Sequence, residues 1–247
     1  MSFEEFHVSE PWRAGLAQAG LDSFDALMAV QPADCLSWHL RGQTYRLALP
    51  DGRTVFLKRD ALTLTKQLLG DLLRLRRTQP MTYKERLAME RASAAGIRTA
   101  ETIAWGQRRR LGLAFQGVLV TGVLAGEGLD DFLRSQPPGE PRRQTMRAVG
   151  EAIGRLYSAG LNWPDLVARH VYAAPGLTVG MLDLERLHPA RRGLRQAMRR
   201  QVDRFIRDCL RAGAGPDETA ALLEALGRHG PAWAQKTTTQ IADDRLG

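Results

Sequence analysis

Between Cys35 and Arg59 the apolar residues alternate with polar ones in three short runs, and this period of two constrains the fold more than any other feature. A Pro50-Asp51-Gly52 turn separates the second run from the third, and Gly42-Gln43 marks a weaker first turn. Alternation broken by turn residues predicts antiparallel strands with one buried face. The N-terminal half is therefore expected to hold a three-stranded antiparallel hairpin sheet.

The apolar period becomes helical on both sides of this sheet. Strand character returns at 102–105 and 111–124, and the chain after that reads mostly as helix. Helices are predicted at about 11–30, 62–77, 81–95, 142–158, 189–211 and 217–228. We therefore predict an α+β chain with two lobes. Its parts are an N-terminal helical extension (1–34), an N-terminal lobe with the sheet (35–122), a helical C-terminal lobe (123–230) and a flexible tail (231–247).

Composition excludes several classes of protein. With 44% hydrophobic and 25% charged residues, the 247-residue chain is neither collagen-like nor wholly disordered. Its two cysteines, Cys35 and Cys209, argue against a disulfide framework or zinc site and for a reducing compartment. No stretch approaches the roughly 18 apolar residues of a spanning helix, and a secretory signal is lacking. A cytoplasmic protein is expected, with peripheral membrane contact at most.

The charge balance is basic, with 35 Lys and Arg against 27 Asp and Glu, a net charge of +8. Arginine-rich stretches at 74–77, 108–110, 191–195 and 199–200 suit a phosphorylated lipid or an anionic membrane face, although charge runs are more often solvated helix faces. The helix at 62–77 either lies on a membrane or packs on the sheet, and we favour packing. Nucleic acid is not an expected partner, because no recognition module occurs.

Lysine is rare in this chain, and one of its four lysines, Lys58, stands near the end of the third predicted strand. A lysine there often only extends its ammonium into solvent. In kinases, however, a lysine on the third strand pairs with nucleotide phosphates and with a glutamate on the next helix. Glu85 and Glu90 lie on the following predicted helix at 81–95, about 140° apart around its axis, so only one of them can face Lys58.

A second set of chemically active residues follows the predicted helix at 142–158. Asp165 is followed by His170, and Asp183 ends a short apolar strand further along. Taken alone, either aspartate is more often a turn or helix cap. In kinases, one loop carboxylate orients the acceptor hydroxyl and another holds Mg²⁺. The strand lysine, the helix glutamate and these two aspartates occur in the kinase order.

This ordered set resembles the bacterial lipopolysaccharide core kinases, the Kdo and heptose kinase family with its InaA-type relatives. That family has a compact, bilobal protein-kinase-like fold, which the resemblance implies here over roughly residues 10–210. The matching segments are Arg41–Arg46, Val55–Arg59, Glu85, Gly96–Thr99, Val118–Thr121, Ser158–Asn162, Asp165, His170–Tyr172 and Leu182–Arg186.

The resemblance implies roles for the N-terminal residues. Lys58 and Glu85 would form the ion pair that positions the phosphates of ATP, with Glu90 the weaker candidate. Gly42 would lie in the hairpin that covers those phosphates. A single glycine in place of a Gly-rich loop weakens the backbone cradle for phosphate.

The resemblance also implies roles for the C-terminal residues. Asp165 would be the catalytic carboxylate, Asp183 the Mg²⁺ ligand and His170 the second residue at the metal. Because an imidazole coordinates Mg²⁺ poorly, we favour a hydrogen bond from His170 to Asp165 or to a phosphate oxygen. Leu184-Glu185 replaces the Phe-Gly of protein kinases, which implies a site without an activation-loop switch.

The expected function is ATP-dependent and Mg²⁺-dependent phosphorylation of a hydroxyl on a lipopolysaccharide core sugar, heptose or Kdo. The expected partner is lipopolysaccharide core or another phosphorylated glycolipid, at the anionic inner face of the inner membrane. Trp163-Pro164 precedes Asp165 where the family commonly has a basic or polar pair, and Trp163 is a candidate for lining an acceptor pocket. This departure leaves a pseudokinase that serves as a binding module as the alternative, and a kinase of another small molecule or protein as a further one.

Overall fold

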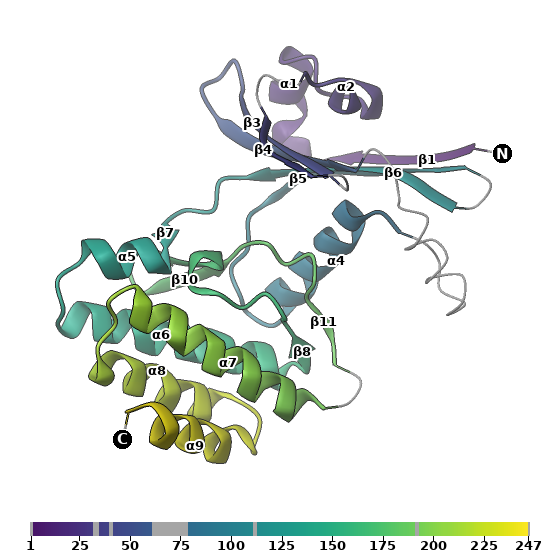
Figure 1. Ribbon diagram of the computed structural model, residues 1–247. Coiled ribbons are helices and arrows are strands. Elements are labelled where there is room, and N and C mark those ends of the chain that lie inside the picture. Colours follow the sequence, from purple (N-terminus) through teal and green to yellow (C-terminus); the bar gives the residue numbers. More distant parts are fainter. Residues whose placement is uncertain are drawn as a thin grey trace. The chain divides into compact units, whose positions relative to one another are not determined.

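The computed structural model describes residues 2–31, 35–39, 42–60, 79–110, 113–190 and 193–246, which divide into two compact units (Figure 1). The first unit comprises Met1–Leu87 and Ala100–Val123, and the second comprises Ala88–Thr99 and Leu124–Gly247. Helix α4 (Met81–Ala94) runs from one unit into the other. The helix predicted at 62–77 and the pair Arg191-Arg192 lie outside the described residues.

The first unit is built on a six-stranded sheet in the order β1-β5-β6-β4-β3-β2, with every neighbouring pair antiparallel. Its elements are β1 (Ser2–Val8), α1 (Glu10–Gln18), α2 (Phe24–Met28), β2 (Cys35–His39), β3 (Gly42–Ala48), β4 (Thr54–Asp60), β5 (Thr102–Arg110) and β6 (Leu113–Gly122). The three strands predicted between Cys35 and Arg59 are confirmed as β2, β3 and β4.

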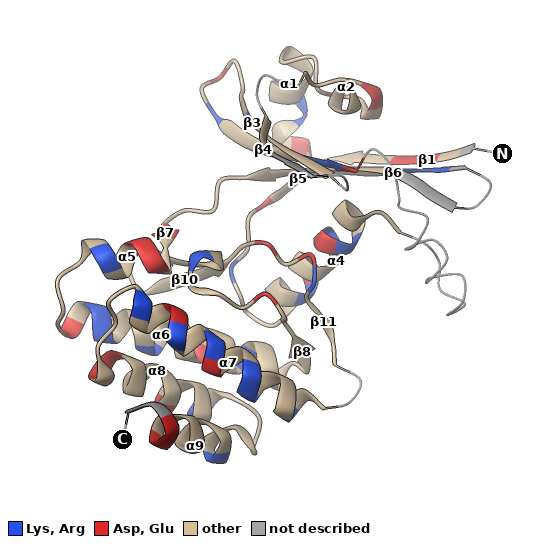
Figure 2. Cartoon of the chain, in the orientation of Figure 1, with Lys and Arg blue, Asp and Glu red and all other residues tan. Residues whose placement is uncertain are grey.

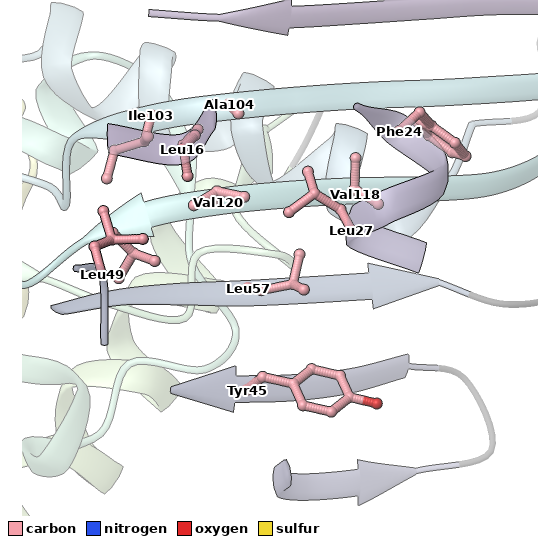
Figure 3. Close-up of a cluster of buried hydrophobic side chains, with 11 residues drawn as sticks. Leu16, Phe24, Leu27, Tyr45, Leu49, Leu57, Ile103, Ala104, Val118 and Val120 are labelled. Carbon is pink, nitrogen blue, oxygen red and sulfur yellow. The ribbon is translucent and has the colours of Figure 1, made fainter. Parts of the chain in front are cut away.

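The two faces of this sheet serve different purposes. Helices α1 and α2 cover one face, where their buried Leu16, Phe24 and Leu27 pack against strand residues such as Leu57 (Figures 1 and 3). Successive strand residues point to opposite faces. Lys58 therefore points away from this hydrophobic core, toward the face on which α4 begins.

The prediction of a purely helical extension at 1–34 is wrong in one respect, because residues 2–8 form strand β1 at the edge of the sheet. Its partner β5 lies about a hundred residues away, in a register that sets Glu4 opposite Arg108. The Arg108 guanidinium contacts the carboxylates of Glu4 (2.6 Å) and Asp25 (2.7 Å). This arginine of the 108–110 stretch thus ties β1 and α2 to the sheet.

The second unit is mostly helical. Its elements are β7 (Glu127–Gly128), α5 (Leu129–Ser135), α6 (Glu140–Ser158), β8 (Leu161–Asn162), the 3-10 turn η2 (Ala168–His170), β9 (Val171–Ala174), β10 (Thr178–Met181), β11 (His188–Pro189), α7 (Leu194–Arg211), α8 (Pro216–His229) and α9 (Ala234–Leu246). The prediction of a flexible tail after residue 230 is wrong, because most of that segment is α9, which packs on α8 and buries Ile241.

Helices α6 and α8 form the central contact of this unit. Gly150 and Gly154 on α6 allow the close approach, since a Cβ on Gly150 would lie 2.2 Å from the Leu222 carbonyl oxygen. A buried ion pair joins the same helices, with Arg142 Nη2 2.8 Å from Glu218 Oε2. No helix among the described residues is long and apolar enough to cross a membrane.

Candidate active site

In the first unit, Lys58 and Glu85 meet in an ion pair. Lys58 Nζ donates to Glu85 Oε1 at 2.6 Å. The Glu85 carboxylate is 6% exposed, whereas the Lys58 side chain is 31% exposed. The choice left open by the sequence is therefore settled geometrically in favour of Glu85, and Glu90, five residues along α4, is exposed. The partly exposed ammonium is held firmly on one side and reaches solvent on the other.

The position of Glu85 depends on how α4 is anchored to the sheet. Asp60, at the end of β4, accepts hydrogen bonds from the Thr82 backbone N–H (2.8 Å) and hydroxyl (3.0 Å). The first turn of a helix has backbone N–H groups without intrahelical partners, and Asp60 supplies one with an acceptor from outside the helix. The Arg86 guanidinium also stacks 3.9 Å from the Trp105 ring centroid on β5.

Asp60 holds this place at an electrostatic cost. Its side chain is buried, and burial raises the pKa of the Asp60 carboxyl, with the negative charge of Glu85 adding to the effect. The two hydrogen bonds from Thr82 act in the opposite direction and lower it.

Gly42 begins β3 and lies against the end of β4. A Cβ at this position would lie 3.2 Å from an Asp60 carboxylate oxygen and 3.3 Å from the Arg59 carbonyl oxygen. Glycine here thus permits close packing of the hairpin on the segment that anchors α4. Its expected contact with phosphate stays a prediction.

In the second unit, Asp165 lies in the loop between β8 and η2. Its Oδ1 accepts a hydrogen bond from Arg186 Nη1 at 2.8 Å. The Asp165 side chain is 28% exposed and the Arg186 side chain 59% exposed. The carboxylate is thus accessible from solvent and has a cationic partner that comes from beyond Asp183 in the sequence.

The Trp163-Pro164 pair connects this loop to the core and to helix α7. Trp163 is fully buried, and its indole N–H points to the Asp183 carbonyl oxygen at 3.4 Å. The Pro164 carbonyl oxygen accepts from the Arg204 guanidinium on α7. Trp163 therefore does not line an acceptor pocket. The support that proline cannot supply through a side-chain hydrogen bond comes from an arginine forty residues away.

His170 connects the loop to Asp183. Its Nδ1 lies 3.0 Å from the Asp165 carbonyl oxygen, and because a carbonyl can only accept, Nδ1 carries the proton. Nε2 then faces the Asp183 carboxylate at 3.5 Å and the Arg169 Nε at 3.3 Å. The hydrogen bond expected from His170 to Asp165 is therefore present, at the backbone carbonyl.

Asp183 has a left-handed backbone conformation, with φ at 57°. Such a conformation is costly for most residues but tolerated by Asp, Asn and Gly. The preceding segment is held on both sides, since the Met181 N–H donates to the Arg98 carbonyl and the Leu182 N–H to the His170 carbonyl, both at 2.9 Å. The fold thus fixes the backbone at Asp183, whose side chain is 47% exposed.

The residues present suit a magnesium ion whose other ligands come from a nucleotide. Among the described residues, no group of three His, Cys, Asp or Glu side chains forms a ready metal cage. Mg²⁺ in phosphoryl-transfer sites typically uses one or two carboxylates together with phosphates and waters. A half-exposed carboxylate on a fixed backbone, as at Asp183, provides the hard oxygen ligand that this mode requires.

Three residues of these two sites escaped the sequence reasoning: Asp60, Arg186 and Arg204. Arg186 lies in the matched segment Leu182–Arg186 but carried no predicted role. Asp60 and Arg204 each act on an element distant in sequence, and neither belongs to a recognisable local motif.

Comparison with solved structures identifies the fold. A solved structure described as WaaP in complex with acyl carrier protein matches with a TM-score of 0.68 and 20% identity, covering 96% of this chain and 99% of that one. At that identity the match shows the shared fold, and it confirms the predicted α+β kinase-like architecture.

Two weaker structural matches also have kinase-like folds. The pseudokinase domain of BIR2, an immune regulator of the RLK/Pelle family, matches with a TM-score of 0.44 at 13% identity, covering 94% of this chain and 84% of that one. A divergent Toxoplasma kinase that lacks the glycine-rich loop matches at 0.47 and 13%, covering 84% and 73%. Both likenesses are too distant to bear on function. No protein of curated function matches the chain significantly.

The decisive comparison is with a protein family. The model of the lipopolysaccharide kinase (Kdo/WaaP) family matches residues 33–225, which is more than half of the chain and includes every site residue described above. Membership indicates a kinase, that is, a phosphotransferase, as the resemblance implied. The chain belongs to the lipopolysaccharide kinase (Kdo/WaaP) family.

Proposed function

We propose that this protein transfers the terminal phosphoryl group of ATP to a hydroxyl of a lipopolysaccharide core sugar, heptose or Kdo. The observation that carries the proposal is the pairing of Lys58 with Glu85 at 2.6 Å in one unit and the Asp165, His170 and Asp183 constellation in the other, in a member of this kinase family.

Each residue has a defined task in this proposal. Lys58, fixed by Glu85, binds phosphate oxygens of the nucleotide through its solvent-facing side. Asp183 holds Mg²⁺, which neutralises charge on the phosphates when bound. Asp165 accepts a hydrogen bond from the acceptor hydroxyl and orients its oxygen for in-line attack. His170 fixes the loop between the two aspartates and is the second candidate residue at the metal.

The support of the Asp165 loop favours an active enzyme over a pseudokinase. Trp163-Pro164 was the departure that motivated the pseudokinase alternative. In the structure, Trp163 packs in the core and the Pro164 carbonyl is held by Arg204, so the loop that carries Asp165 is supported from several elements. Action at the anionic inner face of the inner membrane remains part of the proposal.

Two matched substitutions test the assignment. Asp165→Asn and Asp183→Asn keep side-chain size, and asparagine tolerates the left-handed backbone at residue 183. We expect each to lower phosphate incorporation from ATP into purified lipopolysaccharide core by at least about a hundredfold, with unchanged circular dichroism. Asp183→Asn should in addition weaken the Mg²⁺ dependence of ATP binding. Wild-type transfer rates in both variants would refute the assigned roles.

The same assay addresses the alternatives. If wild-type protein is stabilised by ATP with Mg²⁺ in a thermal-shift titration but transfers phosphate only to another small molecule or to protein, the acceptor assignment is wrong. If ATP with Mg²⁺ neither stabilises the protein nor supports transfer to any acceptor, the pseudokinase alternative holds.

A further inference from the structure

Three exposed arginines contact the catalytic loop and its flanks, and we call them the basic rim: Arg169, Arg186 and Arg204. Arg169 Nε donates to His170 Nε2, Arg186 Nη1 donates to Asp165 Oδ1, and the Arg204 guanidinium donates to the Pro164 carbonyl oxygen. Arg204 belongs to α7, along which basic residues recur in Figure 2. Each cation thus has one anchor on the loop.

Arg186 is the member of the basic rim that contacts the proposed catalytic carboxylate, Asp165. Of its donors, only Nη1 has a partner among the described residues, the Asp165 carboxylate. The Nε and Nη2 groups form the opposite edge of the planar guanidinium, and this edge matches two oxygens of a phosphate or carboxylate. The side chain is 59% exposed, so the edge is open to a ligand.

Stability does not account for this arginine. An ion pair between a mostly exposed arginine and an aspartate contributes little to folding, with a typical value of about 0–1 kcal/mol. The same contact covers one oxygen of the carboxylate that must receive the acceptor hydroxyl. A cation in that place is useful if it binds the acceptor while it orients the carboxylate.

Groups beside the rim already have partners or assigned roles. Asp203 on α7 is paired with Arg207 at 3.2 Å, and Asp183 is assigned to the metal. Arg204 serves mainly as loop support through Pro164. The cations open toward an acceptor beside Asp165 are therefore Arg186 and, one residue before His170, Arg169.

Resting on the proposed function, we propose that Arg186, assisted by Arg169, binds an oxyanion of the acceptor sugar adjacent to the hydroxyl that is phosphorylated. The acceptor is thus selected as an anionic sugar, whose phosphate or carboxylate group occupies the Nε and Nη2 edge of Arg186. Arg186 is a specificity-determining residue, and Asp165 supplies the contact to the hydroxyl.

The test compares acceptors that differ in their anionic groups. Steady-state kinetics are measured on a phosphorylated core oligosaccharide, on the same oligosaccharide after phosphatase treatment, and on one with its carboxylates reduced. For Arg186→Ala we expect KM for the native acceptor to rise about ten- to a hundredfold, with KM for ATP unchanged. One of the two treatments, phosphate removal or carboxylate reduction, should raise the wild-type KM as much as Arg186→Ala does. That treatment identifies which oxyanion is bound.

Conservative and distant variants separate recognition from structure. Arg186→Lys keeps the charge but loses the two-pronged edge, so it should recover only part of the affinity. Arg228→Ala removes an exposed arginine on α8 that pairs with Glu224, and it should leave all constants unchanged. Equal loss of kcat on every acceptor with unchanged KM in Arg186→Ala would overturn the proposal, since that pattern indicates a role confined to positioning Asp165.

A binding measurement keeps this proposal separate from the proposed function. In the Asp183→Asn background, which is expected not to turn over, titration calorimetry with the phosphorylated oligosaccharide reports affinity alone. Weaker binding on adding Arg186→Ala supports the proposal. Unchanged binding refutes it, even where the wild-type protein transfers phosphate. Absence of transfer by the wild-type protein, with Arg186-dependent binding, refutes only the proposed function.

Discussion

The two units each contain a buried glutamate paired with a cation, and the two pairs differ in one respect that separates their roles. Lys58 and Glu85 are 2.6 Å apart, and Arg142 and Glu218 are 2.8 Å apart. The glutamates are equally buried, but the Lys58 side chain is 31% exposed and the Arg142 side chain 3%. The exposure of the cation, rather than the existence of the pair, distinguishes a residue that can meet a ligand from one that joins helices.

The further hydrogen bonds of the Arg142–Glu218 pair support this distinction. Arg142 also donates to the carbonyl oxygens of Gln136 and Gly213, and Glu218 accepts from the Gly215 N–H. The partners of the Arg142 guanidinium thus lie within the fold, at the junction of α6, α8 and the loop after α7. The Lys58 side chain, on strand β4, is instead partly exposed.

The largest expected effect follows from breaking the buried Arg142–Glu218 pair. Arg142→Ala leaves the Glu218 carboxylate buried without its cation, and we expect a loss of about 3–5 kcal/mol in the free energy of unfolding. Urea denaturation measures it. A double variant, Arg142→Met with Glu218→Leu, removes both charges and should recover most of the stability, while phosphate transfer per folded molecule stays at the wild-type level. A loss below about 1 kcal/mol in the single variant would contradict the assigned role.

The next effect follows from altering the Lys58–Glu85 pair while keeping its charge. Lys58→Arg places a bulky planar group where the proposed contact with phosphate uses a compact ammonium, and we expect phosphate transfer to fall about a hundredfold or more. The melting temperature should change little, because Glu85 keeps a cationic partner. Lys236→Arg on α9 is the matched control and should behave as wild type. Wild-type transfer by Lys58→Arg would show that phosphate transfer does not depend on a lysine at this position.

The smallest effect concerns the anchor of α4. The raised pKa of Asp60 means that the folded protein binds the Asp60 proton more tightly than the unfolded chain does. Its favourable contribution is therefore fully present below the unfolded pKa, near 3.9, and is lost as the pH rises through the folded pKa. Asp60→Asn mimics the neutral form at every pH.

Thermal unfolding of this variant between pH 4 and pH 7 checks the sign. The stability of Asp60→Asn relative to wild type should increase as the pH rises through this range. Asp51→Asn is the opposite control, since hydrogen bonds from Arg53 lower the pKa of Asp51. The stability of wild type relative to Asp51→Asn should therefore increase as the pH rises. A flat difference for Asp60→Asn would contradict the raised pKa.

The sequence allowed the prediction of those features that local patterns encode. Alternation between Cys35 and Arg59 predicted three strands, and the kinase arrangement limited the partner of Lys58 to two glutamates on the predicted helix at 81–95. The family resemblance selected Glu85, and the structure places it against Lys58. These features depend on residues a few positions apart or on one motif of known order.

The features that escaped depend on long-range pairing. Strand β1 is held by a partner about a hundred residues away, and its sequence mixes acids with aromatics in a way that hides the strand period. The anchor of α4 by Asp60 and the support of Pro164 by Arg204 each join elements that only the folded chain brings together. No local propensity encodes such contacts, because each half of the contact is an ordinary polar residue.

The left-handed backbone of Asp183 has a consequence for how this activity can be lost by mutation. Asparagine and glycine, the two other residues that readily accept this conformation, are each reached from an aspartate codon by a single base change. Either change removes the carboxylate proposed to hold the metal while sparing the backbone. If Asp183 holds the metal as proposed, a folded but inactive form of this enzyme is one nucleotide away.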